Sequence, residues 1–157
     1  MWRTCDGWRA SPGDARLSHL MATILLAGED PALLEGLVQS LVALGHNPSV
    51  ALSLAEARES AARGNAPLMA VIDRVFVDGT GTEVLGVPLA PGGTLVLYRA
   101  PGSTAGALSP PLQRAVLADL MLPLERNRLV ALVQHVEERA RATGRSPRHT
   151  PRETRRA

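Results

Sequence analysis

The side chain best placed to do chemistry in this sequence is the carboxylate of Asp73. The apolar run Ala70–Ile72 leads directly into Asp73, and the pair Asp78-Gly79 closes the segment five residues later. One explanation is structural, because Asp favours turns in which its side chain bonds nearby backbone amides. The other is functional, because ligands of parallel α/β sheets gather at the carboxyl ends of the strands. The surrounding sequence has to decide between the two.

Several other kinds of chemistry lack the residues that they need. All 17 residues of the Lys+Arg total are arginines, which excludes Schiff-base catalysis and a phosphate-loop lysine. The four histidines show no metal-ligand spacing, and no G-x-S-x-G nucleophile elbow is present. Cys5 is the only cysteine, so an intrachain disulfide is excluded and we expect a reducing, cytoplasmic compartment. We therefore do not expect an enzyme.

The composition predicts one folded domain with a tail at each end. The chain has 157 residues, of which 45% are hydrophobic and 3% aromatic, so Leu, Val and Ala must build the core. No apolar stretch reaches the roughly 20 residues that a membrane span requires, and we expect no membrane partner. We predict a disordered leader over residues 1–21, with Met21 as an alternative start, a domain over residues 22–142, and a disordered Arg- and Pro-rich tail over residues 143–157.

Short apolar segments alternate with helical patterns from Thr23 onward. The expected strands are Thr23–Ala27, Pro48–Leu52, Leu68–Asp73, Thr94–Tyr98 and Ala118–Leu122. Capping residues and apolar periodicity predict helices from Pro31 to Gly45, from Ser53 to about Arg63, from Thr82 to Leu85, and from Glu125 to about Arg141. Between the last two strands, Pro110 and Pro111 should break a helix and leave one or two turns on either side.

This alternation predicts an α/β fold, a flavodoxin-like doubly wound sheet of five parallel strands with helices on both faces. The carboxyl ends of the strands then meet at one edge of the sheet. Glu29, Asp73 and the pair Tyr98–Arg99 all follow or end predicted strands. Their convergence favours the functional interpretation of Asp73.

The order of elements and four local strings resemble the receiver domain of bacterial two-component response regulators. Ile24–Leu37 ("ILLAGEDPALLEGL") is similar to that family's first strand, acidic cluster and first helix, and Ala70–Gly81 ("AVIDRVFVDGTG") to its phosphoacceptor strand. Leu95–Ala100 ("LVLYRA") and Leu120–Leu124 ("LMLPL") resemble the fourth and fifth strands. The resemblance spans about Thr23 to Arg141. It implies phosphoryl transfer from a histidine kinase to an aspartate beside Mg²⁺.

The resemblance places Asp73 at the phosphoacceptor position and Glu29 at the second position of the family's acidic pair. Gly28 stands at the first position. Asp30 extends the acidic cluster, but it is equally suited to cap the helix that begins at Pro31. Since one or two carboxylates and several waters can hold Mg²⁺, Glu29 and Asp73 imply a weak metal site.

Two further positions depart from the family. Arg99 stands where the family has Thr or Ser, and Leu122 where it has Lys. Losing a charged partner for a phosphoryl oxygen costs about 1.5–3 kcal/mol, so the resemblance implies an impaired phosphoacceptor. We expect an ion pair of Arg99 with Asp73 to replace the metal and to lower the pKa of Asp73. Arg74 is the alternative partner of Asp73, although strand alternation points it the other way.

These replacements predict a single-domain pseudo-receiver that signals by protein–protein contact with a histidine kinase or a downstream regulator. One alternative is a module that binds a small molecule or an anion at the carboxyl edge, through the Gly-rich loops Pro91–Thr94 and Pro101–Gly106. Another is weak nucleic-acid binding by Arg139–Ala157, which holds seven arginines and one acid. The tail contains no aromatic residue for base stacking, which disfavours a nucleic-acid partner.

Overall fold

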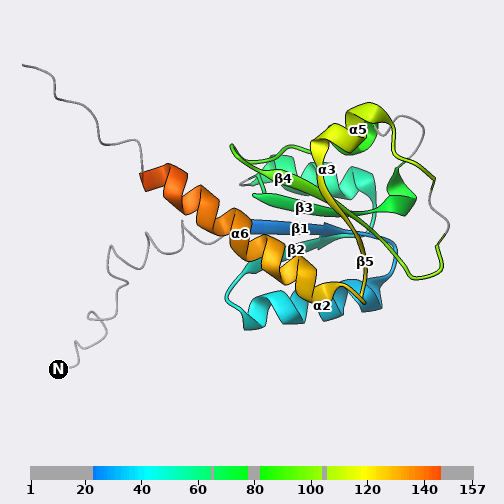
Figure 1. Cartoon of the computed structure of the whole chain (residues 1–157), viewed down its shortest axis with the longest axis horizontal. Coiled ribbons are helices and arrows are strands. Elements are labelled where there is room, and N and C mark those ends of the chain that lie inside the picture. Colours follow the sequence, from blue (N-terminus) through cyan, green and yellow to red (C-terminus); the bar gives the residue numbers. More distant parts are fainter. Residues whose placement is uncertain (1–22, 65, 78–81, 104–105, 146–157) are drawn as a thin grey trace, which may run out of the picture.

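A five-stranded parallel sheet lies at the centre of the molecule (Figure 1). The computed structural model describes residues 23–64, 66–77, 82–103 and 106–145. The strands stand in the order β2-β1-β3-β4-β5, and all neighbouring pairs are parallel, which confirms the predicted sheet. The strands are β1 (Thr23–Ala27), β2 (Asn47–Ala51), β3 (Met69–Asp73), β4 (Thr94–Arg99) and β5 (Val116–Met121).

Helices cover both faces of the sheet, as the alternating pattern predicted (Figure 1). Leucines and valines of α2 and α6 pack on one face, while α3, α4 and α5 supply the core residues of the other. The helices are α2 (Pro31–Ala43), α3 (Leu54–Arg63), the 3-10 turn η2 (Arg74–Phe76), α4 (Thr82–Leu85), α5 (Pro110–Ala115) and α6 (Arg126–Arg145).

Side chains along the inner strands alternate between these two layers. In β3, Met69 and Val71 belong to the layer with α2 and α6, whereas Ala70 and Ile72 belong to the layer with α3, α4 and α5. Both faces of β3 are therefore buried, and this explains its continuous apolar run. By the same alternation, Asp73 ends the strand on the face of α2 and α6.

Local signals in the sequence set the ends of the first helices. Asp30 is extended, and its Oδ1 accepts the amides of two first-turn residues of α2 at 3.1 and 3.3 Å. Ser53 caps α3 by accepting the amide of Glu56 at 3.1 Å. Gly45 follows α2 with a φ of 89°, a left-handed conformation that glycine adopts readily. The predicted caps are confirmed.

Pro110 and Pro111 act differently from the expectation. They form the first turn of α5 instead of interrupting a longer helix, and residues 106–109 before them are not helical. The physical reason is that proline fixes a helical φ, and its missing N–H group has no intrahelical partner in a first turn. The expectation of helical turns on both sides of the prolines is wrong for these residues.

The division of the chain into a leader, a domain and a tail stays a prediction. α6 continues to Arg145, past the boundary expected at residue 142, while the expected leader (1–21) and most of the expected tail lie outside the described residues. No helix in the described part of the chain has the length and apolar character needed to cross a bilayer.

Candidate functional site

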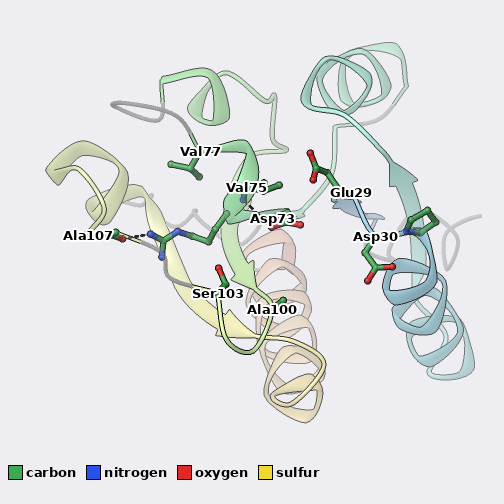
Figure 2. Close-up of a pocket in the computed structure, with 11 residues that line it drawn as sticks. Glu29, Asp30, Asp73, Val75, Val77, Ala100, Ser103 and Ala107 are labelled. Atoms are coloured by element: carbon green, nitrogen blue, oxygen red, sulfur yellow. Dashed lines mark hydrogen bonds between the residues drawn. The ribbon is translucent and has the colours of Figure 1, made fainter.

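A pocket of about 870 Å³ opens at the carboxyl edge of the sheet (Figure 2). Glu29 and Asp30 line it from the loop after β1, Asp73 lines it from the end of β3, and Ala100 and Ser103 line it from the loop after β4. The remaining lining residues are Pro31, Arg74, Val75, Val77, Gly106 and Ala107. The structure therefore brings the three predicted acidic residues to one pocket.

Asp73 has a local structural role as well as a place in this pocket. Its Oδ1 accepts the amide of Val75 at 3.0 Å and so caps the 3-10 turn η2. The side chain is partly buried. Asp73 therefore has both the turn-forming role and the place at the carboxyl edge that the sequence allowed. One of its carboxylate oxygens already accepts a backbone amide.

Asp30 and Glu29 differ in how firmly they are held. The carboxylate of Asp30 caps α2 through two amides of the first turn, which favours the capping role over a direct role at Asp73. Glu29 is exposed on the loop after β1. Only Asp73 of the three is positioned by the sheet itself.

Gly28, Asp73 and Tyr98 lie at the same level across three adjacent strands. Ala27 of β1 pairs with Ile72 of β3, and Asp73 pairs with Tyr98 of β4. A Cβ atom added to Gly28 would lie 1.9 Å from the Tyr98 hydroxyl oxygen and 3.4 Å from Oδ2 of Asp73. The first of these separations is shorter than any non-bonded contact. The Tyr98 hydroxyl therefore occupies the space that a side chain on residue 28 would need.

The Tyr98 hydroxyl is a buried donor beside acidic groups. Tyr98 is 1% exposed, and its hydroxyl oxygen has no hydrogen-bond partner of ordinary geometry among the described residues. Burial raises the pKa of Tyr98 above its ordinary value, and the charge and acceptor oxygens of Asp73, followed by the charges of Asp30 and Glu29, raise it further. Asp73 lies near enough to disfavour the charged form of this hydroxyl, although no hydrogen bond of ordinary geometry joins the two side chains. Tyr98 therefore remains protonated near neutral pH.

Arg99 does not make the predicted ion pair with Asp73. It follows Tyr98 in β4 and lines a separate pocket of about 440 Å³ together with Arg74 and Asp119. No salt bridge of Arg99 occurs among the described residues. The prediction is wrong because alternation turns Arg99 to the opposite face of the sheet from Tyr98 and Asp73.

Arg74 also avoids Asp73, as strand alternation predicted. Its Nη1 lies 2.6 Å from Oδ2 of Asp119 on β5, and its Nη2 donates to the carbonyl of Gly106. The Arg74 side chain is 9% exposed. This ion pair holds Arg74, directly after β3, to Asp119 within β5 on the other side of β4.

Leu122, which the sequence resemblance places at a lysine position, brings no cation to the site. It is fully buried and belongs to the core between the sheet and the helices α2 and α6. Its backbone amide donates to the carbonyl of Arg99 at 3.0 Å. An apolar side chain in this position can neither pair with a phosphoryl group nor hold a second charge.

The residues at the edge do not fit a Mg²⁺ centre. Among the described residues, no group of three or more His, Cys, Asp or Glu side chains is placed to hold a metal ion. One oxygen of Asp73 is bonded to an amide, Asp30 caps α2, and a protonated hydroxyl takes the place of an acid on residue 28. Hard cations prefer several oxygen ligands of carboxylate or carbonyl type. Glu29 and Asp73 alone form an incomplete donor set.

The two Gly-rich loops considered as anion sites lie at different edges. Ser103 and Gly106 of Pro101–Gly106 line the site pocket. Pro91–Thr94 leads into the first residue of β4, so it lies at the amino edge and is too far along the strand to join the site. Most of the arginine-rich tail lies outside the described residues.

No protein-family model matches the sequence, and no curated protein is significantly similar to it. Solved structures do match. The signal receiver domain of a putative LuxO repressor protein from Vibrio parahaemolyticus has a TM-score of 0.63 and 20% identity, over 82% of this chain and 99% of that chain. A receiver domain protein from Methanospirillum hungatei JF-1 has a TM-score of 0.58 and 22% identity, over 78% and 98%. One from Clostridium thermocellum has a TM-score of 0.63 and 15% identity, over 78% and 99%.

The chain therefore has the fold of response-regulator receiver domains, as the sequence resemblance predicted. The strand order β2-β1-β3-β4-β5 and the helices on both faces define this α/β class. At these identities the matches establish the architecture, and the chemistry has to be argued from the residues of the edge.

Proposed function

We propose that this chain is a pseudo-receiver, a cytoplasmic signalling module that acts by protein–protein contact and whose output does not require phosphorylation of Asp73. One observation carries this proposal. The Tyr98 hydroxyl fills the side-chain space of residue 28, directly beside Asp73. An acid on residue 28 would require the Tyr98 side chain to move from its present position.

The chemistry of phosphoryl transfer supports the proposal. An attacking carboxylate and the incoming phosphoryl group are both negative, so a metal or a cation must offset their charge. Beside Asp73, only the exposed Glu29 is left as a further ligand for a metal. Of the nearby positions that could supply a cation, Arg74 is bound to Asp119 and Leu122 carries no charge. We propose that Asp73 accepts a phosphoryl group slowly at best.

The proposed partner surface lies along α5, β5 and the start of α6. β5 is an edge strand, and its register against β4 shifts beside Leu117, which is 44% exposed. Leu124, just before α6, is 71% exposed. Exposed apolar side chains beside an unpaired strand edge are suited to a protein partner, either a histidine kinase or a downstream regulator.

A titration with Mg²⁺ and then beryllofluoride, followed by amide NMR, tests the incomplete site. The wild-type protein should show no saturating shifts at Glu29, Asp73 or Ala100. The variant with Gly28→Asp and Tyr98→Phe, which restores an acid and removes the hydroxyl, should gain metal-dependent shifts there. Saturation of the wild-type site, with a stable beryllofluoride adduct, would overturn the proposal.

The contact surface is tested by retention of host proteins on the immobilised chain. Leu117→Glu and Leu124→Glu should lose a protein that the wild type retains, while Asp73→Asn should keep it. Val42→Glu is a matched control, because Val42 is 55% exposed on α2. Loss of the same protein in Asp73→Asn would contradict an output independent of phosphorylation.

A further inference from the structure

A second pocket, of about 470 Å³, lies between the first half of α2 and the start of α6. This volume falls within the range of roughly 300–1,000 Å³ typical of small-molecule sites. Its lining residues are Asp30, Ala32, Leu33, Gly36, Leu37, Ala100, Pro101, Leu122, Pro123 and Arg126. Eight of these ten residues are uncharged and small or apolar, so the walls suit an apolar ligand body.

Small residues on α2 keep this pocket open. Ala32 and Gly36 are four residues apart and therefore share one face of the helix. A Cβ atom on Gly36 would meet no atom within 4 Å, so the space beside it is unfilled. Leu37 and Leu122, which are 1% and 0% exposed, provide an apolar floor continuous with the core.

The two charged residues of the lining differ in whether they already have a partner. Asp30 already accepts two amides of α2. The side chain of Arg126 makes no ion pair within the described part of the chain. Arg126 also begins α6, where the partial positive charge of the helix disfavours a cation unless an anion lies near. The amides at the start of α2 partly offset the charge of Asp30, whereas no anion offsets the charge of Arg126 among the described residues.

We propose that this pocket binds a small organic carboxylate, with its apolar body on Leu33, Leu37 and Leu122 and its carboxylate on the guanidinium of Arg126. The inference goes beyond the proposed function, because it requires neither phosphorylation nor a protein partner. Asp30 and Ala100 line both this pocket and the pocket of Asp73. A ligand bound in this pocket would therefore lie next to the candidate site around Asp73.

The test is an amide NMR titration of the full chain with 2-naphthoate and, as its uncharged counterpart, 2-naphthalenemethanol. Naphthoate should shift Ala32, Leu33, Gly36 and Leu122 saturably, and should bind about tenfold more tightly than the alcohol, the order of magnitude of one charge-assisted hydrogen bond. Equal affinities, no binding of either probe, or shifts confined to other surfaces would overturn the proposal.

Variants separate the two parts of the site. Arg126→Gln should lower naphthoate affinity to that of the alcohol, whereas Arg128→Gln, on an exposed residue 3.5 Å from Glu125, should leave it unchanged. Asp30→Asn, which keeps a good N-cap, should raise naphthoate affinity. An unaltered affinity in Arg126→Gln would refute the assigned contact.

The apolar part is tested by filling the pocket. Gly36→Leu should abolish binding of both probes, while Gln39→Leu, on an exposed α2 residue outside the lining, should not. Binding that survives Gly36→Leu in a folded protein would exclude this pocket. None of these readouts depends on Mg²⁺ or phosphate, so the pseudo-receiver proposal can fail while this one stands.

Discussion

The hydroxyl of Tyr98 and the missing side chain of Gly28 occupy the same space. A Cβ on residue 28 would approach the hydroxyl oxygen to 1.9 Å and the ring carbon that carries it to 3.2 Å. Glycine at this position is therefore a packing requirement of the tyrosine. The relationship connects β1 with β4 across β3, and any side chain on residue 28 would have to displace the Tyr98 hydroxyl.

Gly28→Ala should destabilise the fold by about 1–3 kcal/mol, the usual cost of overpacking a rigid core. The cost should fall in a Tyr98→Phe background, because the closest clashing atom is then absent. Urea unfolding of the four members of this double-mutant cycle gives the coupling free energy. Additive effects of the two changes would show that the residues do not compete for space.

Alkaline titration should reveal the raised pKa of Tyr98. The chain has one tyrosine and no lysine, so tyrosinate absorbance in a Cys5→Ser background reports this group. In urea the midpoint should lie near the ordinary value of about 10, and in the folded protein well above it, because burial and then Asp73 disfavour the phenolate. A native midpoint equal to the unfolded one would contradict the buried position.

The same shift predicts how stability depends on pH. Above pH 10 the unfolded chain loses the tyrosine proton while the native state keeps it, so the native state binds more protons. The free energy of unfolding should then fall by up to about 1.4 kcal/mol per pH unit. Below pH 10 this contribution is constant. Urea midpoints across pH 8–11 should show the decline in the wild type and a flatter profile in Tyr98→Phe.

The ion pair of Arg74 with Asp119 should contribute to the free energy of unfolding mainly because the Arg74 side chain is buried. Asp119→Leu leaves the guanidinium without its carboxylate partner and should cost about 1–3 kcal/mol. Adding Arg74→Met should recover part of that loss, since an apolar pair carries no desolvation cost. Unfolding by denaturant measures both variants. A double variant less stable than Asp119→Leu would contradict this account.

A second buried pair should hold α6 to the turn after α2. Nδ1 of His46 lies 2.9 Å from Oε2 of Glu137, and the two residues are 7% and 9% exposed. Glu137→Ala should destabilise by about 1–3 kcal/mol, whereas Glu138→Ala, on its exposed neighbour, should remain within about 0.5 kcal/mol. Thermal unfolding of both variants checks the difference; similar losses would contradict a specific role for the pair.

Local sequence signals were sufficient for most of the architecture. The strands, the Asp30 cap and the Ser53 cap depend on apolar runs and short-range hydrogen bonds, which can be read from neighbouring residues. The doubly wound parallel sheet was inferred from the alternation of strands and helices, and the structure confirms it with the order β2-β1-β3-β4-β5. The grouping of Glu29 with Asp73 at one edge follows from that order.

The contacts within the site could not be predicted from the sequence, because they depend on how residues far apart in the chain are aligned. Whether Tyr98 or Arg99 faces Asp73 depends on the register of β3 against β4, and a shift of one residue exchanges them. The sequence placed both residues at the edge, and the wrong one was paired with Asp73. The sequence did show a glycine, Gly28, where the resemblance expects an acid. That Tyr98 fills the space of the missing side chain is visible only once β1, β3 and β4 are aligned.

The most direct test of the central claim is intact-mass analysis after incubation with acetyl phosphate and Mg²⁺, beside a receiver domain known to be phosphorylated under the same conditions. Asp73 should remain largely unmodified in the wild type, and Asp73→Asn should give the same mass profile relative to its own unmodified mass. Stoichiometric addition of one phosphoryl group to the wild type, absent in Asp73→Asn, would contradict the account.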